Sequence, residues 1–170
     1  MSSTRSRASR TSSSVSASRG GPQLAMKAAL ENVQASEVRT WDMHATATPG
    51  DATEIEHSLE MLHPDVVFTA RKGTFGHGMS VGGGWELTAQ HMGMAKGKLF
   101  PMAMTEGELH ADVKVHSAKF VQADGCAVSE GYSGKLSMGI GGINSCVISR
   151  PWDPQYLEEQ IREMVTAERG

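Results

Sequence analysis

Glu130 is the residue of this sequence best suited to proton transfer. It alternates with Val128 and Tyr132 along a stretch that we expect to be a strand, so the three side chains share one face. Burial among apolar neighbours disfavours the charged form of a carboxyl group and raises its pKa. Such a group can act as a general acid or base on a small apolar substrate. In the alternative interpretation, a bulge or a polar outer face places Glu130 in water, or in an ion pair with Lys119 or Lys135.

Two other polar side chains are candidate catalytic partners of Glu130. The hydroxyl of Tyr132 could orient a carbonyl group or a water molecule, although Tyr132 also suits a core position with its hydroxyl at the rim. His91 is the histidine most suited to meet a ligand, provided that its helix lines the pocket. The expected ligand-binding residues are apolar or aromatic: Trp41, Phe68, Trp85 and Val128. Packing alone would explain Trp41 equally well.

The remaining reactive residue types indicate neither a metal nor a cofactor. The seven histidines show no HExxH or Cys/His cluster spacing. The glycines between Gly76 and Gly84 match neither the GxGxxG fingerprint nor a phosphate loop. Cys126 and Cys146 lack CxxC spacing, so we expect small core residues, with a disulfide or a reactive thiol as the alternatives. We therefore expect a protein that uses no cofactor and binds no metal.

Composition separates an N-terminal tail from a folded region. The chain has 170 residues, of which 39% are hydrophobic, and a net charge of −3, which suits one domain over residues 23–170 and disfavours nucleic acid as a partner. No run of about 18 apolar residues predicts a membrane span. Residues 1–22 are rich in Ser and Arg and lack acidic residues. They predict either a disordered tail or a transit peptide to a mitochondrion or plastid, and without such a peptide we expect a cytoplasmic protein.

The N-terminal half predicts three helices and one strand. Apolar residues at helical spacing, including Val38 and Trp41, predict a helix over residues 23–44. Asp51 and Glu54 have capping-box spacing at the start of a second helix, which Pro64 ends before a strand over residues 66–68. A third helix is expected over residues 85–94, weakened by neighbouring glycines.

The C-terminal half predicts a series of antiparallel strands. Apolar and polar residues alternate over residues 109–121, and Asp124-Gly125 is typical of a hairpin turn that returns the chain as a strand over residues 126–138. Glycines at 139–142 allow another reversal before a strand over residues 143–149. Asp153-Pro154 then predicts the start of a C-terminal helix.

The segment DATEIEHSLEMLHPDVVF, residues 51–68, resembles the entry to the sheet in the SnoaL-like branch of the nuclear-transport-factor-like superfamily. The order of predicted elements extends this resemblance from Leu24 to Arg150. It implies an α+β cone in which three helices close a curved, mostly antiparallel sheet around a pocket, with homodimers formed through the sheet. The C-terminal helix is an addition to that pattern. The superfamily's usual pairing of Asp with His is not traceable here.

These expectations combine into two functional hypotheses. The first is a cofactor-independent isomerase, or a lyase such as a dehydratase, or a cyclase, in which Glu130 moves protons on an apolar or carbonyl-bearing metabolite. The second is a non-catalytic module of the same fold that binds a ligand or mediates dimerisation. A cavity that opens onto Glu130 would favour the enzyme, and a filled interior would favour the module.

Overall fold

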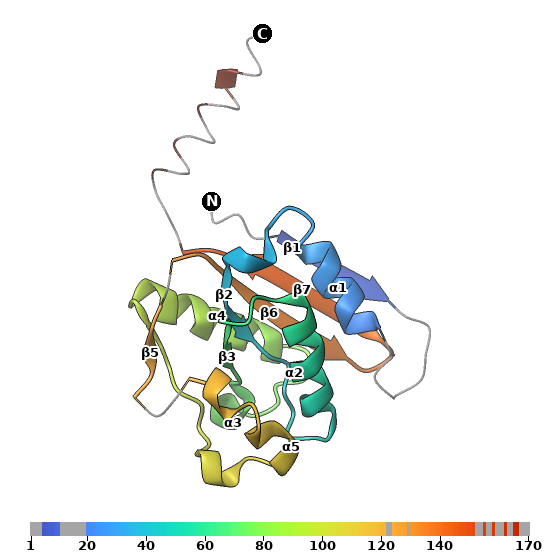
Figure 1. Ribbon diagram of the computed structural model, residues 1–170. Coiled ribbons are helices and arrows are strands. Elements are labelled where there is room, and N and C mark those ends of the chain that lie inside the picture. Colours follow the sequence, from blue (N-terminus) through green and yellow to red (C-terminus); the bar gives the residue numbers. More distant parts are fainter. Residues whose placement is uncertain are drawn as a thin grey trace.

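A mixed five-stranded sheet forms the centre of the molecule (Figure 1). The computed structural model describes residues 5–10, 20–121, 124–128 and 130–151 and the single positions 155, 158, 162, 165 and 166. The strands of this sheet are β1 (Arg5–Arg10), β2 (Val38–Asp42), β3 (Val67–Thr69), β6 (Tyr132–Gly139) and β7 (Ile143–Ser149). Their spatial order is β1-β7-β6-β2-β3. The β1-β7 and β7-β6 pairs are antiparallel, whereas β6-β2 and β2-β3 are parallel.

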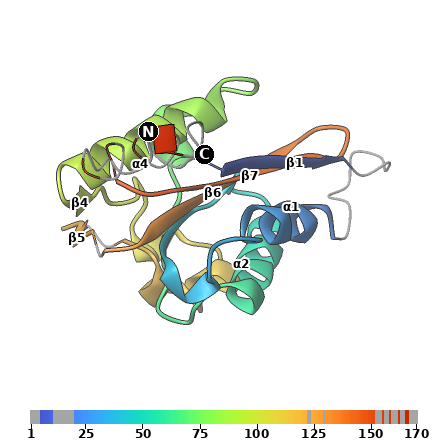
Figure 2. The same cartoon turned by 90° about the horizontal axis from the view of Figure 1, so that it is seen from above.

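Helices cover both faces of the sheet, as Figure 2 shows. Helices α1 (Gly21–Ala29) and α2 (Gly50–Met61) lie on one face, and α4 (Gly82–Ala95) lies on the other. The face toward α1 and α2 carries the apolar core, whose members include Met26, Trp41, Phe68, Leu136 and Ile148. The face toward α4 is also buried but carries the polar and charged side chains of Thr40, Asp42, Ser133 and Lys135, and Glu86 of α4 contacts Lys135.

The predicted cone with a mostly antiparallel sheet is wrong, because β2 is a parallel central strand. A helix between two strands of one sheet, here α2 between β2 and β3, lets the strands run parallel. The helix predicted over residues 23–44 includes residues 38–42, because Leu30, Val33, Val38 and Trp41 can share one helical face. In the structure, α1 ends at Ala29, a short 3₁₀ helix spans Ala35–Glu37, and β2 follows directly. Strands covered on both faces lose the alternation that would reveal them.

The predicted strand over residues 109–121 is also wrong. This stretch contains α5 (Ala111–Lys114) and a 3₁₀ helix at Ser117–Lys119, and Val115 on its supposedly buried face is 77% exposed. Asp124-Gly125 does form a turn, with Gly125 at a φ of 70°. The strand that follows, β5 (Cys126–Ala127), pairs instead with β4 (Lys98–Leu99) in a separate antiparallel ribbon.

Several predicted elements are confirmed. Helix α2 spans the predicted second helix, β3 overlaps the predicted strand at 66–68, and α4 contains the predicted third helix. The glycine-rich reversal joins β6 to β7 as an antiparallel pair. His63 shapes the turn before β3, since its Nδ1 accepts a hydrogen bond from the backbone N–H of Asp65 at 3.2 Å.

The two ends of the chain are only partly described. Within the predicted tail, Arg5–Arg10 form the edge strand β1, so these residues belong to the sheet. The role of the tail as a transit peptide stays a prediction. The helix predicted after Pro154 lies almost entirely outside the described residues. None of the described helices combines the length and the apolar character that crossing a bilayer requires.

Candidate functional site

The predicted proton carrier is not in a pocket. Glu130 is exposed, and Gly131 beside it has a φ of 130°, which interrupts the strand alternation on which the prediction of burial depended. Val128 is half-buried and donates its backbone N–H to Gly97, beside the β4-β5 ribbon. Tyr132 begins β6 and packs against the apolar core, which agrees with the alternative of a core position given above. Glu130 is therefore exposed, in contrast to the burial that the alternation predicts.

The other predicted ligand-binding residues lie apart from one another. His91 and four further residues of α4 alone form a shallow hollow, and burial lowers the pKa of His91. Trp85 is half-exposed on the same helix, with its ring over Gly78. Trp41 and Phe68 are completely buried members of the core. The predicted site residues thus do not converge on one cavity.

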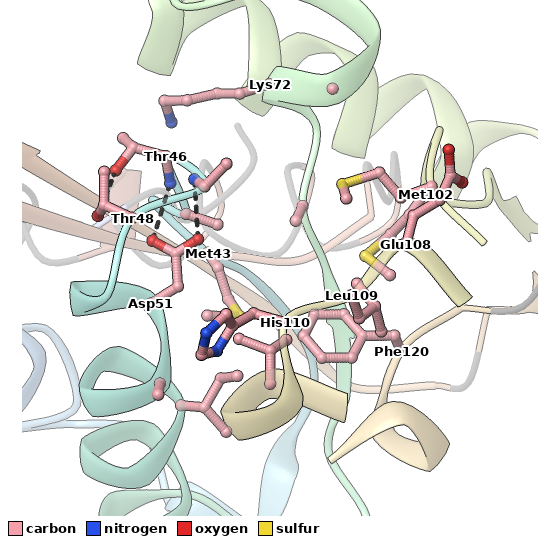
Figure 3. A pocket seen from close by; sticks show the side chains of 18 of the residues that line it. Met43, Thr46, Thr48, Asp51, Lys72, Met102, Glu108, Leu109, His110 and Phe120 are labelled. Atoms are coloured by element: carbon pink, nitrogen blue, oxygen red, sulfur yellow. Dashed lines mark hydrogen bonds between the residues drawn. The ribbon is translucent and has the colours of Figure 1, made fainter. Parts of the chain in front are cut away.

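A cavity of about 540 Å³ lies instead beyond the carboxyl ends of β2 and β3 (Figure 3). Ligands of parallel sheets commonly bind at this end of the strands. Its walls come from the loop after β2, the start of α2, the segment after β3 and residues 102–113. The lining is mainly apolar and includes Met43, Ile55, Met102, Val113 and Phe120. Lys72 and His77 also line the cavity and bring polar groups to it.

Two carboxylates of α2 hold the loop that leads from β2 into this cavity. Glu54 accepts hydrogen bonds from the backbone N–H groups of His44 at 2.6 Å and Ala45 at 2.9 Å. Asp51 accepts from the next two N–H groups, those of Thr46 at 3.0 Å and Ala47 at 2.9 Å (Figure 3). Four consecutive donors are therefore bound, which stabilises the left-handed φ values of 26° at Ala45 and 58° at Ala47.

The capping box predicted from Asp51 and Glu54 does not form. The N-cap position of α2 is Pro49, which makes no side-chain cap hydrogen bond. Both carboxylates turn back toward the preceding loop instead. Glu54 and Asp51 therefore hold the loop that carries His44, and do not cap the helix.

His44 lies beside His77. Their ring centroids are 5.9 Å apart and the rings meet edge to face at 83°. The Nδ1 atom of His77 accepts a hydrogen bond from the backbone N–H of Met79 at 3.2 Å, which assigns the proton of the neutral ring to Nε2. The ammonium of Lys72, which begins the short helix α3 (Lys72–Phe75), donates to the carbonyl oxygen of His44.

A buried charged cluster lies behind this histidine pair, under α4. The Oε1 atom of Glu86 is 2.8 Å from the Lys72 ammonium, and its Oε2 atom is 2.7 Å from the Lys135 ammonium. Lys135 also lies 3.5 Å from Asp42, which is 3.4 Å from Arg71 on its other side. Three cations thus face two carboxylates, and the cluster carries a surplus positive charge.

These surroundings set the protonation states at the site. Burial, reinforced by the positive charges of Lys72 and Lys135, lowers the pKa of His44 to about 4, so its ring is neutral at pH 7. Burial alone would raise the pKa of Glu86, but Lys135 and Lys72 together outweigh it and lower that pKa. Burial raises the pKa of Glu54 to about 7, against the two backbone hydrogen bonds that favour its charged form. Burial likewise raises the pKa of Asp42.

Neither cysteine is prepared to act as a nucleophile at this site. Cys146 is buried in β7, and burial raises the pKa of its thiol to about 12. Cys126 lies in the β4-β5 ribbon, and burial raises its pKa as well. Both thiols are free, and neither lines the cavity. Within the described stretches, no group of three or more His, Cys, Asp or Glu residues could hold a metal ion.

The sequence analysis missed His44, Lys72 and His77. The sequence does contain a usable signal. His44 follows β2 by two positions, and after β3 Lys72 precedes His77 by five positions. Because residues 38–42 were assigned to a helix, His44 was placed at a helix end and not at the carboxyl edge of a sheet. Once β2 and β3 are known to be parallel neighbours, both histidines fall at the same edge.

Comparison with known proteins relates the chain to ketosynthases. The family model described as "Beta-ketoacyl synthase, C-terminal domain" matches residues 1–106, more than half of the chain. A ketosynthase from module 1 of the bacillaene synthase of Bacillus amyloliquefaciens FZB42 is 14% identical, with a TM-score of 0.75, over 87% of this chain and 29% of that chain. None of the curated proteins matches significantly.

Two further solved structures show the same likeness. The oxazolomycin ketosynthase domain from Streptomyces albus JA3453 is 21% identical, with a TM-score of 0.67, over 89% of this chain and 30% of that chain. A type II polyketide acyl-carrier protein in complex with its ketosynthase matches at 19% identity and a TM-score of 0.70, over 87% of this chain and 38% of that chain. The chain thus spans about a third of the ketosynthases that it matches, and at these identities the likeness establishes the fold.

These matches correct the resemblance drawn from residues 51–68. The SnoaL-like assignment is wrong, and so are the isomerase, dehydratase and cyclase activities that it implied. The predicted helix, turn and short strand do occur in this segment, but β3 pairs in parallel with β2. The local pattern was real, but it does not distinguish the two folds.

Proposed function

Because the chain belongs to the β-ketoacyl synthase C-terminal domain family, we propose that it supplies the histidine side of a condensing site that joins two acyl thioesters into a β-ketoacyl product. The observation that carries this proposal is the pairing of His44 with His77, 5.9 Å apart between ring centroids, beside an apolar cavity. An acyl chain suits such a lining, since burial of its methylene groups is favourable.

The proposed reaction needs donors for a developing negative charge. A β-ketoacyl thioester forms when the α carbon of one thioester bonds to the carbonyl carbon of another and the C–S bond of the latter breaks. The attacking partner, a malonyl-type thioester, loses CO2 from its α carbon and becomes an enolate, whose charge lies largely on the thioester oxygen; the displaced sulfur leaves as a thiolate and takes up a proton. The Nε2–H of His77 and the neutral ring of His44 are suitable donors, because fixed N–H groups in a site of low polarity stabilise an oxyanion strongly.

Lys72 has a supporting role in this proposal. Its ammonium is bound to the carbonyl oxygen of His44 and to Glu86, so it holds the loop and adds positive charge near the enolate. The acylated thiol comes from another segment of polypeptide, because neither Cys126 nor Cys146 lines the cavity. The limited share of each ketosynthase that this chain spans supports the same arrangement.

The partners follow from the same proposal. One matched structure holds an acyl-carrier protein with its ketosynthase, which supports carrier-bound thioesters as the form in which substrates arrive. The small metabolite of the original hypothesis is thereby replaced by an acyl thioester. Homodimerisation through an open sheet face finds no support, since α1 and α2 cover one face of the described sheet and α4 covers the other.

Decarboxylation of malonyl pantetheine tests the histidine pair without a thiol nucleophile. Loss of CO2 from this thioester leaves an enolate, which then takes a proton from water. We expect the full chain to accelerate CO2 release, and His77→Ala to reduce the rate roughly 100-fold, as removal of one oxyanion donor does. His110→Ala, at an exposed histidine that also lines the cavity, is the matched control. Equal rates for the parent protein, His44→Ala and His77→Ala would contradict the proposal.

A further inference from the structure

We propose that Lys135 is a positioning residue for the histidine pair: its buried ammonium fixes the backbone that carries His44 and supplies the surplus charge of the cluster. This inference rests on the proposed function for its relation to catalysis. The contacts of Lys135 with the backbone and with Glu86 do not depend on that function.

The first argument is the burial of Lys135 and the way its donors are used. The side chain lies in the middle of β6, is 2% exposed, and donates to the carbonyl oxygens of Met43 at 3.0 Å and Leu136 at 2.8 Å. Met43 immediately precedes His44. A lysine in the centre of a strand, 92 positions away in the sequence, therefore holds the residue next to the site.

The second argument is a bridge through Glu86. Its two oxygens contact Lys72 and Lys135. Those two ammonium groups in turn bind consecutive carbonyl oxygens, of His44 and of Met43 respectively. One carboxylate on α4 thus fixes two cations that hold the peptide groups before and after the Cα atom of His44. With the N–H of His44 bound by Glu54, this backbone is restrained from both directions.

The third argument is charge balance. Without Lys135, the cluster would still contain two neutral pairs, Arg71 with Asp42 and Lys72 with Glu86. Lys135 is therefore a third cation that Glu86 and Asp42 share with Lys72 and Arg71, and its charge also reaches the carboxyl group of Glu54. Its effect falls on the neighbouring imidazole and on negative charge that develops during the reaction.

The charges around His44 come from several elements. The protonated imidazole of His44 is disfavoured by the charges of Lys72 on α3 and Lys135 on β6, and by His77 in the loop after α3. Glu86 on α4 favours it. Glu54 on α2 binds the backbone N–H of His44. Removal of Lys135 alone should thus make His44 easier to protonate.

The variant Lys135→Met tests the inference, because methionine is similar in shape to the aliphatic part of lysine and lacks the charge and the donors. The measurement is the NMR titration of the His44 ring in the full chain. We expect the pKa of His44 to rise by up to roughly one unit, since a like charge is removed. We also expect lower turnover of malonyl pantetheine with little change in KM. Lys27→Met, at an exposed lysine of α1, is the control and should change neither value. A folded Lys135→Met protein with an unchanged His44 titration overturns the inference.

A measurement on the parent protein decides the matter if Lys135→Met does not fold. The ammonium protons of Lys135 should be visible by NMR and protected from exchange, and His44 should stay neutral well below pH 6. Rapid exchange of these protons, together with a His44 pKa near 6.5, overturns the inference. A His44 titration that shifts in the variant, combined with no CO2 release by the parent protein, would leave the positioning role standing and remove the proposed function.

Discussion

At the scale of single residues, the backbone around His44 decides what its ring can do. The ring itself is an ordinary imidazole, but the N–H of His44 is bound by Glu54 and its carbonyl oxygen by Lys72. Burial and two nearby cations then keep the ring neutral. None of these partners is a neighbour of His44 in the sequence, so residue types alone could not reveal the site. What the sequence could show was the presence of histidines, and their spacing excluded only a metal.

The variant Glu54→Gln tests how much this restraint contributes. Glutamine keeps one acceptor oxygen, so one of the N–H groups of His44 and Ala45 loses its partner. We expect the free energy of unfolding to fall by about 1–3 kcal/mol, the usual cost of an unsatisfied buried donor. Chemical denaturation measures this loss, and hydrogen exchange at the amides of His44 and Ala45 should quicken. Glu56→Gln, on the exposed side of the same helix, should have no effect; equal losses in both variants would argue against the restraint.

At the scale of elements, a helix or turn could be predicted where its own residues determine its conformation, without contacts from distant parts of the chain. The stripe of α2 and the glycine-rich reversal between β6 and β7 were recognisable for this reason. Strand β2 was not, because it is buried on both faces and Trp41 matches a helical spacing as well as an extended one. For residues 109–121 the error was the opposite: a strand was predicted from alternating residues, but the stretch forms short helical turns at the surface. At β2, pairing with the distant strands β3 and β6 overrode the local pattern.

Close packing of β2 on β6 predicts a sensitive glycine. A Cβ atom at Gly134 would overlap the ring of Trp41 and lie 3.2 Å from Ile148. Both neighbours are buried and have little room to move, so we expect Gly134→Ala to destabilise the protein by about 1–3 kcal/mol through overpacking. Gly139→Ala at the exposed end of the same strand is the control, since its Cβ would meet its nearest atom at 3.4 Å. Urea denaturation with indistinguishable midpoints for the two variants would show that the Trp41 ring can yield.

At the scale of the whole molecule, the site is assembled from both faces and both halves of the fold. The loop after β2 meets α2, α3, α4 and β6 around one pair of rings. The sheet is apolar toward α1 and α2 and charged toward α4, and the ends of β2 and β3 bring both environments to the cavity. Sequence reasoning identified α2 and α4 but not the parallel order that places their carboxylates beside β2. The fold class and the site were therefore missed together.

Stability against pH should show two opposing contributions. The pKa of Glu54 is raised in the folded state, from 4.5 to about 7, so the folded protein holds the extra proton and stability falls as pH rises through that window. The pKa of His44 is lowered from 6.5 to about 4, so stability falls as pH decreases through that window. The two effects partly cancel between pH 4.5 and 6.5. In Glu54→Gln, stability should rise more steeply with pH over this range, by up to about 1.4 kcal/mol per pH unit. Parallel profiles for parent and variant, measured by denaturation at several pH values, would contradict the assigned shifts.

Ala45 and Ala47, in the loop between β2 and α2, have a consequence for the size of the cavity. Ala45 and Ala47 hold backbone angles that glycine adopts with less strain, yet each presents a methyl group to the cavity wall. Glycine at these positions would ease the backbone and enlarge the space beside Lys72. The loop therefore keeps a less favourable backbone conformation together with a narrower cavity, and the width of the cavity at this point depends on two methyl groups.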